Sequence, residues 1–312
     1  MIHWLKAGVL GAVATVALGL PAAAQTVALG TTQGGATSQI ATAIANVVSA
    51  AGEVQVRPQV SANTSQYIPL VNAGRLDFGI ANYPQTWYAV DGSGMSSAPN
   101  PDLRVVATLF PFQAGIVAPE SAGIASYADV AGKKVPRFPD GSLGDYIIRM
   151  ALSAGGLTYE DVTEVPIANF PRMYDAIKQG QTDISIATIG SQPTYDLEAA
   201  LGDIQFIPFD ADDTEAVSAV LPGTYLWEID ANEELPGLDA PTRVFAYDYL
   251  LFAHKDVPDE IVTKVAKAMA EGEEALKATS PLWREYDPST LGKEHGLEYH
   301  PAAIAFYESL GN

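Results

Sequence analysis

The feature that most constrains this chain is a residue pattern that occurs twice, 106 positions apart. When residues 63–82 are laid over residues 169–188, these pairs carry the same amino acid: Asn63 and Asn169, Gly74 and Gly180, Asp77 and Asp183, Ile80 and Ile186, and Ala81 and Ala187. These identities are few, and any two strand–helix–strand units share the same general pattern. Whether the pattern is a true repeat or only the pattern common to such units, the sequence predicts two similar α/β units, one after the other along the chain.

The first unit carries alternating signals for strands and helices. Residues 27–30 form a short apolar run that ends in glycine, which is typical of a strand followed by a turn. Apolar residues spaced three or four apart within residues 37–51 predict a helix, and Gly52 ends it. Alternating valines predict a strand at residues 54–60, and a further helix and strand follow. Strands that alternate with helices are typical of an α/β fold with an open sheet.

The last part of the chain belongs to neither copy of the pattern. It predicts a strand at residues 242–252 and helices that start near Val257 and near His300. If this segment returns to the first unit, the fold consists of two lobes joined by a hinge around a ligand cleft. The predicted organisation is a first lobe of residues 25–112 and 218–312, and a second lobe of residues 113–217.

The first 24 residues have the composition of a secretory signal peptide. Lys6 precedes an apolar run without charge, and the segment closes with Pro21 and three alanines. A buried N-terminal helix is the alternative, although the segment lacks helix caps. A membrane span is disfavoured because Pro21 interrupts the apolar run. We therefore predict export, cleavage near Ala24 and a periplasmic mature protein.

The charge and the composition exclude several functional classes. Lys and Arg number 17 against 37 Asp and Glu, and this net charge of -20 argues against nucleic-acid binding, which requires a basic surface. The chain has no cysteine and therefore no cysteine-ligated metal site. It also lacks the Gly-x-Ser-x-Gly, Walker A and His-Glu-x-x-His motifs. We therefore predict a protein that is not an enzyme and that uses no cofactor and no metal ion.

Two glycine-rich turns are candidates for the ligand site. Residues 30–35 and residues 140–144 each stand between a predicted strand and a predicted helix. Backbone N–H groups at a helix N-terminus can bind an anion, and nearby threonine and serine hydroxyls add donors that suit a carboxylate. Ordinary helix capping would explain any one of these residues equally well.

Two arginines are candidates for direct contact with a carboxylate. Arg172 falls in the first turn of a predicted helix, where a cation is mildly unfavourable, so an anionic partner would explain its presence. Arg137 stands at the end of the strand before the second glycine-rich turn and could form a bidentate clamp. A surface ion pair is the alternative for both arginines.

The predicted ligand-binding residues come from these turns, from the two arginines and from strand ends that the repeat brings to the same cleft. Tyr83 follows a predicted strand and could either wall the pocket or belong to the core. The full set is Thr31, Thr32, Gly34, Thr37, Ser38, Asn63, Ser65, Asn82, Tyr83, Arg137, Ser142, Leu143, Arg172, Thr188 and Gly190.

Several stretches of the chain resemble one family, the TAXI-type solute-binding proteins of TRAP transporters. In chain order they are Leu29-Gly30-Thr31 with Gly34-Gly35, Asn63 to Ile80, Pro101-Asp102-Leu103-Arg104 with Leu109-Phe110-Pro111, Gly132-Lys133-Lys134-Val135 with Gly141-Ser142, Gly180-Gln181-Thr182-Asp183, and His300-Pro301-Ala302-Ala303 with Phe306-Tyr307. Three departures from the family pattern fall in the expected pocket: Thr37-Ser38, Asn82-Tyr83-Pro84 and Leu143. Glutamate therefore cannot be assumed to be the ligand.

The resemblance implies a two-lobed periplasmic binding protein fold of type II, with a hinge beside the ligand cleft. It implies an extracytoplasmic solute receptor that binds a small organic anion, such as a glutamate-like amino acid or another carboxylate. The partner would be the membrane subunit of a TRAP transporter, and we expect the receptor to be a monomer. The alternative is a solute-sensing subunit for a membrane signalling kinase, which the sequence does not separate from transport.

Overall fold

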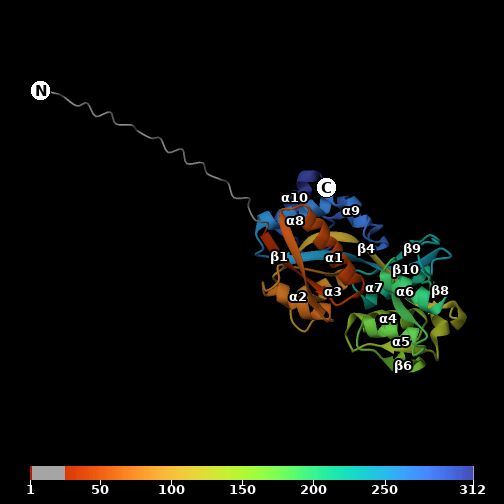
Figure 1. The fold of residues 1–312 in the computed structure, drawn as a ribbon. Coiled ribbons are helices and arrows are strands. Elements are labelled where there is room, and N and C mark those ends of the chain that lie inside the picture. The colour runs from red at the N-terminus through yellow and green to blue at the C-terminus, as the bar shows by residue number, and fades with distance from the viewer. Residues whose placement is uncertain (2–24, 312) are drawn as a thin grey trace.

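The computed structural model describes Met1 and residues 25–311. Apart from Met1, the predicted signal peptide of residues 1–24 lies outside the described residues. The described chain folds into two α/β lobes, and Figure 1 shows the first in red, orange and blue and the second mainly in green. Among the described helices, none is long and apolar enough to cross a membrane.

Strands and helices alternate along the described chain up to α6, as expected for an α/β fold. The strands are β1 (Gln25–Thr32), β2 (Val54–Ser61), β3 (Phe78–Asn82), β4 (Leu103–Pro119), β5 (Lys134–Arg137), β6 (Thr163–Pro166), β7 (Ser185–Thr188), β8 (Ile204–Phe206), β9 (Tyr225–Ile229) and β10 (Thr242–His254). The α-helices are α1 (Gly35–Ala50), α2 (Thr64–Asn72), α3 (Tyr83–Asp91), α4 (Leu143–Ala154), α5 (Phe170–Lys178), α6 (Gln192–Leu201), α7 (Thr214–Val220), α8 (Asp259–Glu271), α9 (Glu273–Lys277) and α10 (Pro301–Leu310). The short 3-10 helices are η1 (Glu120–Ala122), η2 (Tyr127–Val130), η3 (Tyr159–Asp161), η4 (Ala211–Asp213), η5 (Pro281–Trp283) and η6 (Pro288–Thr290).

Most of these strands belong to one sheet that extends through both lobes. Its order is β2-β1-β3-β10-β4-β7, with β8 paired to β4 and β9 paired to β10. β1 runs parallel to β2 and β3, whereas β10 runs antiparallel to β3 and β4. The apolar side of α1, including Ile40 and Ile44, is buried in the same core cluster as Leu29 of β1. The parallel pair of β5 and β6 belongs to the second lobe.

The repeat that the sequence indicates is present in the structure. α2 and α5 begin and end 106 residues apart. Asp77 accepts a hydrogen bond from the backbone N–H of Ala28 at 2.7 Å, and Asp183 accepts the corresponding bond from Lys134 at 2.7 Å. Each carboxylate ties the turn before one strand to the first strand of its own lobe. The two lobes therefore share this contact as well as the order of these elements.

Two long strands, β4 and β10, cross between the lobes as an antiparallel ribbon. They pair from Leu103 and His254 at one end to Ala114 and Phe245 at the other. β3 flanks the first-lobe end, and β7, β8 and β9 flank the second-lobe end. The predicted boundary between the lobes, after residue 112, falls within β4, inside this ribbon.

The segment after β8 packs on the second lobe, farther along the chain than the predicted boundary. Leu235 and Leu238 are buried in the same apolar cluster as β8 and Val244 of β10. This packing removes apolar surface of the second lobe from water and ties the segment to it. We therefore propose that the second lobe runs from residue 113 to the start of β10, instead of ending at residue 217.

The C-terminal segment returns to the first lobe, as the sequence predicts. α8 packs against α1 and α10, and the Tyr307 hydroxyl of α10 donates a hydrogen bond to the carbonyl of Val106 in β4 at 2.9 Å. Trp283 of η5 is fully buried, with its ring centroid 4.9 Å from that of Phe110 in β4. The segment is therefore fixed to the crossing ribbon at two separate points.

One histidine in this segment makes stability depend on pH. The His295 ring contacts the rings of Tyr83 and Tyr299, each with a centroid distance of 5.4 Å. Burial lowers the pKa of His295 from its usual 6.5, against the opposing effect of the Asp248 charge. Between the folded pKa and 6.5, the unfolded chain binds more protons than the folded chain, so stability falls as the pH drops through that window.

We therefore expect the melting temperature to fall between pH 7 and pH 5, and the His295→Gln variant to lose part of that fall. Thermal unfolding followed by circular dichroism at several pH values measures it. His254→Gln is the matched control, because His254 lies in β10 outside this aromatic cluster. If His295→Gln leaves the pH dependence unchanged, the assignment to His295 is wrong.

Candidate functional site

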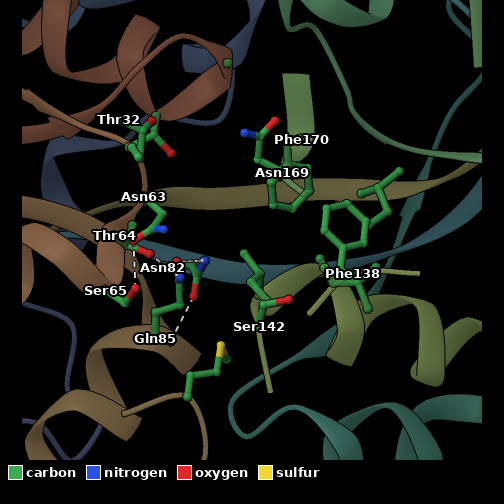
Figure 2. A pocket seen from close by; sticks show the side chains of 18 of the residues that line it. Thr32, Asn63, Thr64, Ser65, Asn82, Gln85, Phe138, Ser142, Asn169 and Phe170 are labelled. Atoms are coloured by element: carbon green, nitrogen blue, oxygen red, sulfur yellow. Dashed lines mark hydrogen bonds between the residues drawn. The ribbon is translucent and has the colours of Figure 1, made fainter. Parts of the chain in front are cut away.

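A cavity of about 610 Å³ lies between the two lobes. This volume suits a small organic molecule, because ligand cavities measure about 300–1,000 Å³. The first lobe contributes the turn before α1, the start of α2, and the end of β3 with α3, while the second lobe contributes the turn before α4 and the start of α5. Residues of β4, β7 and β10 line the cavity between the two walls, and Figure 2 shows the cavity from close by.

The repeat brings helix N-termini to the cavity from both lobes. α1 and α2 begin beside it in the first lobe, and the corresponding helices α4 and α5 begin beside it in the second. Backbone N–H groups in the first turn of a helix lack partners within the helix and carry partial positive charge. The cavity is therefore suited to the hydrogen-bond acceptors of a ligand.

Asn63 and Asn169 occupy equivalent positions at the starts of α2 and α5. Asn63 Oδ1 accepts a hydrogen bond from the N–H of Gln66 at 3.2 Å, and Asn169 Oδ1 accepts one from the N–H of Arg172 at 3.1 Å. These caps hold the amide oxygens against the helices, which leaves the amide nitrogens as donors. Figure 2 shows the two nitrogens on the sides of the side chains that face each other across the cavity. The pair can therefore donate hydrogen bonds to a ligand from both lobes.

The rest of the first-lobe wall is polar and is held by its own hydrogen bonds. Asn82 donates from Nδ2 to Gln85 Oε1 at 2.8 Å, and Gln85 donates from Nε2 to the Thr64 hydroxyl. The Ser65 hydroxyl donates to Asn63 Oδ1 at 2.7 Å, and Figure 2 shows these contacts as dashed lines. The amides and hydroxyls of this wall are thus oriented by the protein itself.

The second-lobe wall is apolar at positions that are polar in the first lobe. At the spacing of 106 residues, three threonines that line the cavity correspond to apolar lining residues: Thr32 to Phe138, Thr37 to Leu143, and Thr64 to Phe170. The rings of Phe138 and Phe170 lie 5.2 Å apart between centroids. Together they give this wall an aromatic surface that has no counterpart in the first lobe at the same positions.

Tyrosines of β10 line the cavity between the two walls. The ring of Tyr247 stacks on that of Phe112 with a centroid distance of 5.5 Å, and the Tyr249 hydroxyl lies 2.6 Å from the Thr37 hydroxyl. Burial raises the pKa of Tyr247 and of Tyr249 above the usual 10.0. Both hydroxyls therefore stay protonated and uncharged at neutral pH.

The structure brings most of the predicted site residues together in the cavity lining. These are Thr32, Gly34, Thr37, Asn63, Ser65, Asn82, Ser142, Leu143 and Thr188. The predicted set omits further lining residues, several of them aromatic; they include Thr64, Gln85, Phe112, Phe138, Asn169, Phe170, Tyr174, Tyr247 and Tyr249. The repeat carried a usable signal for Phe138 and Phe170, because each stands 106 residues after a threonine of the first-lobe wall.

Four other predicted residues lie outside the cavity lining: Thr31, Ser38, Tyr83 and Gly190. Adjacent strand residues point to opposite faces, so Thr32 lines the cavity while Thr31 is buried and bonds to the carbonyl of Thr37 at 3.3 Å. A helix turns by about 100° per residue, which takes Ser38 off the face that Thr37 presents. The Tyr83 hydroxyl donates to the carbonyl of His295 at 2.9 Å, and Gly190 packs against Pro281.

The two predicted arginines also lie outside the lining, so neither forms the expected carboxylate clamp in this structure. Arg137 pairs with Asp145 at 2.6 Å, with Glu164 at 2.9 Å and with Asp140, which occupies all of its guanidinium nitrogens. The next residue, Phe138, takes the place beside the cavity. The Arg172 side chain is 72% exposed and lies 3.4 Å from Asp175, which matches the alternative of a surface ion pair.

The cavity contains little charge. Among the described residues that line it, Asp140 is the one with a charged side chain, and that carboxylate already pairs with Arg137. Within residues 25–311 no group of three His, Cys, Asp or Glu side chains is placed to hold a metal ion. The site is therefore built from amides, hydroxyls, helix N-termini and aromatic rings.

Comparison with known proteins finds one family model and several solved structures that are similar to this chain. A model of the NMT1-like family matches residues 29–311. Among solved structures, the alkanesulfonate-binding protein SsuA from Xanthomonas axonopodis pv. citri, bound to MOPS, is 13% identical with a TM-score of 0.53, over 91% of this chain and 90% of that chain. The periplasmic aliphatic sulphonate binding protein SsuA from Escherichia coli is 18% identical with a TM-score of 0.49, over 91% of this chain and 83% of that chain. The likeness to the Xanthomonas structure confirms the predicted fold of periplasmic binding proteins.

Proposed function

This chain belongs to the NMT1-like family, and from that membership and the cavity between its lobes we propose that it is a solute receptor outside the cytoplasm. It binds one small molecule between the lobes and delivers it to a transporter in the membrane. The binding-protein fold supports this proposal, and the predicted signal peptide supports a periplasmic location.

The single observation that carries the proposal is the construction of the cavity from equivalent elements of two lobes. Helix N-termini from both sides meet there, and the β4–β10 ribbon crosses between the two walls. A ligand that contacts both walls favours the arrangement in which the lobes are close together. Such a change in arrangement is what a membrane partner can recognise.

We further propose that the partner is the membrane subunit of a TRAP transporter and that the receptor acts as a monomer. The support is the order of sequence stretches that resemble the TAXI-type proteins, from Leu29-Gly30-Thr31 to Phe306-Tyr307. A small organic anion was the ligand expected from the same resemblance. The two arginines predicted to contact its carboxylate lie outside the cavity lining, so we argue the chemistry of the ligand from the lining itself.

The proposed function predicts binding with a 1:1 stoichiometry and no chemical conversion. The protein from residue 25 onward, refolded to remove any carried molecule, should bind a small molecule in calorimetry, and mass spectrometry should recover that molecule unchanged. A ligand at 100 times its dissociation constant adds about 2.7 kcal/mol to stability. Conversion of the bound molecule would contradict a receptor and indicate an enzyme.

A cavity-filling variant locates the binding. Ser65→Trp places a large ring where a small exposed side chain lines the cavity, and it should abolish binding. Ser218→Trp is the matched control, because Ser218 is exposed on α7 and does not line the cavity. Equal affinities in the two variants would place the binding site elsewhere.

A further inference from the structure

The two walls of the cavity differ in chemistry although they are equivalent in structure. The first-lobe wall offers amides and hydroxyls, and the second-lobe wall offers the Phe138–Phe170 ring pair and Leu143 at the matching positions. Apolar surface buried against these rings contributes about 25 cal/mol per Å². A ligand that fills the cavity therefore has a polar end and an apolar end of aromatic size.

The polar end meets mainly hydrogen-bond donors. The amide nitrogens of Asn63 and Asn169 face the cavity, and the N-cap of α1, Gly34, provides no side chain to cap the first N–H groups of that helix. Gly34 and Gly35 both have positive φ, at 76° and 74°, a conformation that favours glycine. Without side chains, these glycines leave the start of α1 open to the cavity. The complementary ligand groups are acceptors such as carbonyl or hydroxyl oxygens.

A net negative charge on the ligand has no cationic partner among the lining residues. Arg137 is already paired with three carboxylates, and the lining's charged side chain, Asp140, is itself an acid. Removing a carboxylate or sulfonate from water without a cationic partner costs several kcal/mol. Partial positive charges at helix N-termini offset part of that cost. At α2, α3, α4 and α5, however, the N-cap side chain already accepts a hydrogen bond from one backbone N–H of the helix.

We propose that the ligand is an uncharged amphipathic molecule, with a carbonyl- or amide-bearing end on the polar wall and an aromatic or similarly flat apolar end against Phe138 and Phe170. This inference rests on the proposed function, because it names the solute class for the same cavity. It differs from the anion expected from sequence, which the walls do not complement.

Pairs of probes that differ only in charge test the proposal. The pairs are indole-3-acetamide with indole-3-acetate, phenylacetamide with phenylacetate, and nicotinamide with nicotinate, each titrated into the refolded protein by calorimetry. We expect the amide of at least one pair to bind at least about tenfold more tightly than its acid, which is about 1.4 kcal/mol. We also expect that affinity to stay constant from pH 5 to pH 9, because Tyr247 and Tyr249 remain protonated throughout.

Variants of one wall make the test specific. Phe170→Ala should weaken the best amide probe by about tenfold or more, whereas Arg172→Ala, two residues farther along α5, should change its affinity less than about twofold. Phe170→Leu keeps the wall apolar. If the Phe170→Ala variant loses affinity because apolar surface is missing from the cavity, and not because the protein misfolds, the Phe170→Leu variant should retain most of the affinity. Phe170→Arg places a cation in the wall and should shift the preference toward the acid of the same pair.

The outcomes separate this inference from the proposed function. If an acid binds more tightly than its amide to the unmodified protein, the inference is overturned and the receptor function stands. If L-glutamate binds more tightly than every amide, the same conclusion follows. If no probe of either charge binds, the inference is overturned, and the receptor function is then judged by its own binding and mass-spectrometry test.

Discussion

Replacing Asp145 with alanine is expected to lower the free energy of unfolding by about 2–3 kcal/mol, because two cations and a backbone N–H then lose a buried acceptor. The Asp145 carboxylate is fully buried and pairs with Arg137 at 2.6 Å and with Arg149 at 2.5 Å. Its Oδ2 also accepts a hydrogen bond from the N–H of Gly141 at 3.0 Å, in the turn that borders the cavity. The loss should therefore appear both in stability and in the shape of the second-lobe wall.

Urea unfolding followed by circular dichroism measures this loss. Asp140→Ala is the matched control, since Asp140 pairs with the same Arg137 but its side chain is 85% exposed. Exposed ion pairs contribute about 0–1 kcal/mol, so the control should remain close to the unmodified protein. Similar stabilities for the two variants would mean that the buried carboxylate is not the main anchor of this turn.

Replacing Trp283 with alanine is expected to cost about 3–5 kcal/mol, because the indole is fully buried where η5 meets the crossing ribbon. Its ring contacts that of Phe110 at 4.9 Å and that of Tyr286 at 5.4 Å. The indole nitrogen has no hydrogen-bond partner among the described residues, so the loss comes from packing alone. Trp283→Phe keeps a ring at this position and should lose clearly less stability.

The same urea measurement serves for Trp283, with Trp87→Ala as its control. Trp87 is a half-buried tryptophan of α3, so the Trp87→Ala substitution removes the same atoms from a more exposed place. The expected order of stability is the Trp87→Ala variant above the Trp283→Ala variant. The reverse order would show that the C-terminal segment contributes little to holding the ribbon.

The fold was largely predictable because its signals are local or repeated. Asp77 and Asp183 stand at the same offset in both units, and the structure shows that each makes the same backbone contact within its lobe. The strand–helix alternation follows from short apolar runs and glycine positions that a single sequence displays. The extent of the second lobe was harder to predict. Leu235 and Leu238 pack with β8, and no local sequence pattern connects these residues.

The candidate site was predictable where backbone turns define it and not where side-chain direction does. Asn63 and Ser142 stand in polar or glycine-rich turns before helices, and both line the cavity. The sequence places Arg137 beside such a turn as well, but its neutralisation depends on Asp145 and Glu164, which come together only in the folded lobe. Phe138 lines the cavity because of the direction in which its side chain points, and the sequence alone does not show that direction.

The ribbon of β4 and β10 has a mechanical consequence. The two strands stay paired from Leu103 to Ala114, with register shifts at Tyr249–Leu250 and Leu251–Phe252. Two-stranded ribbons accept a wide range of twist, whereas a sharp bend would break their ladder of hydrogen bonds. We therefore expect the lobes to move relative to each other mainly by a twist of this ribbon, without loss of its hydrogen bonds.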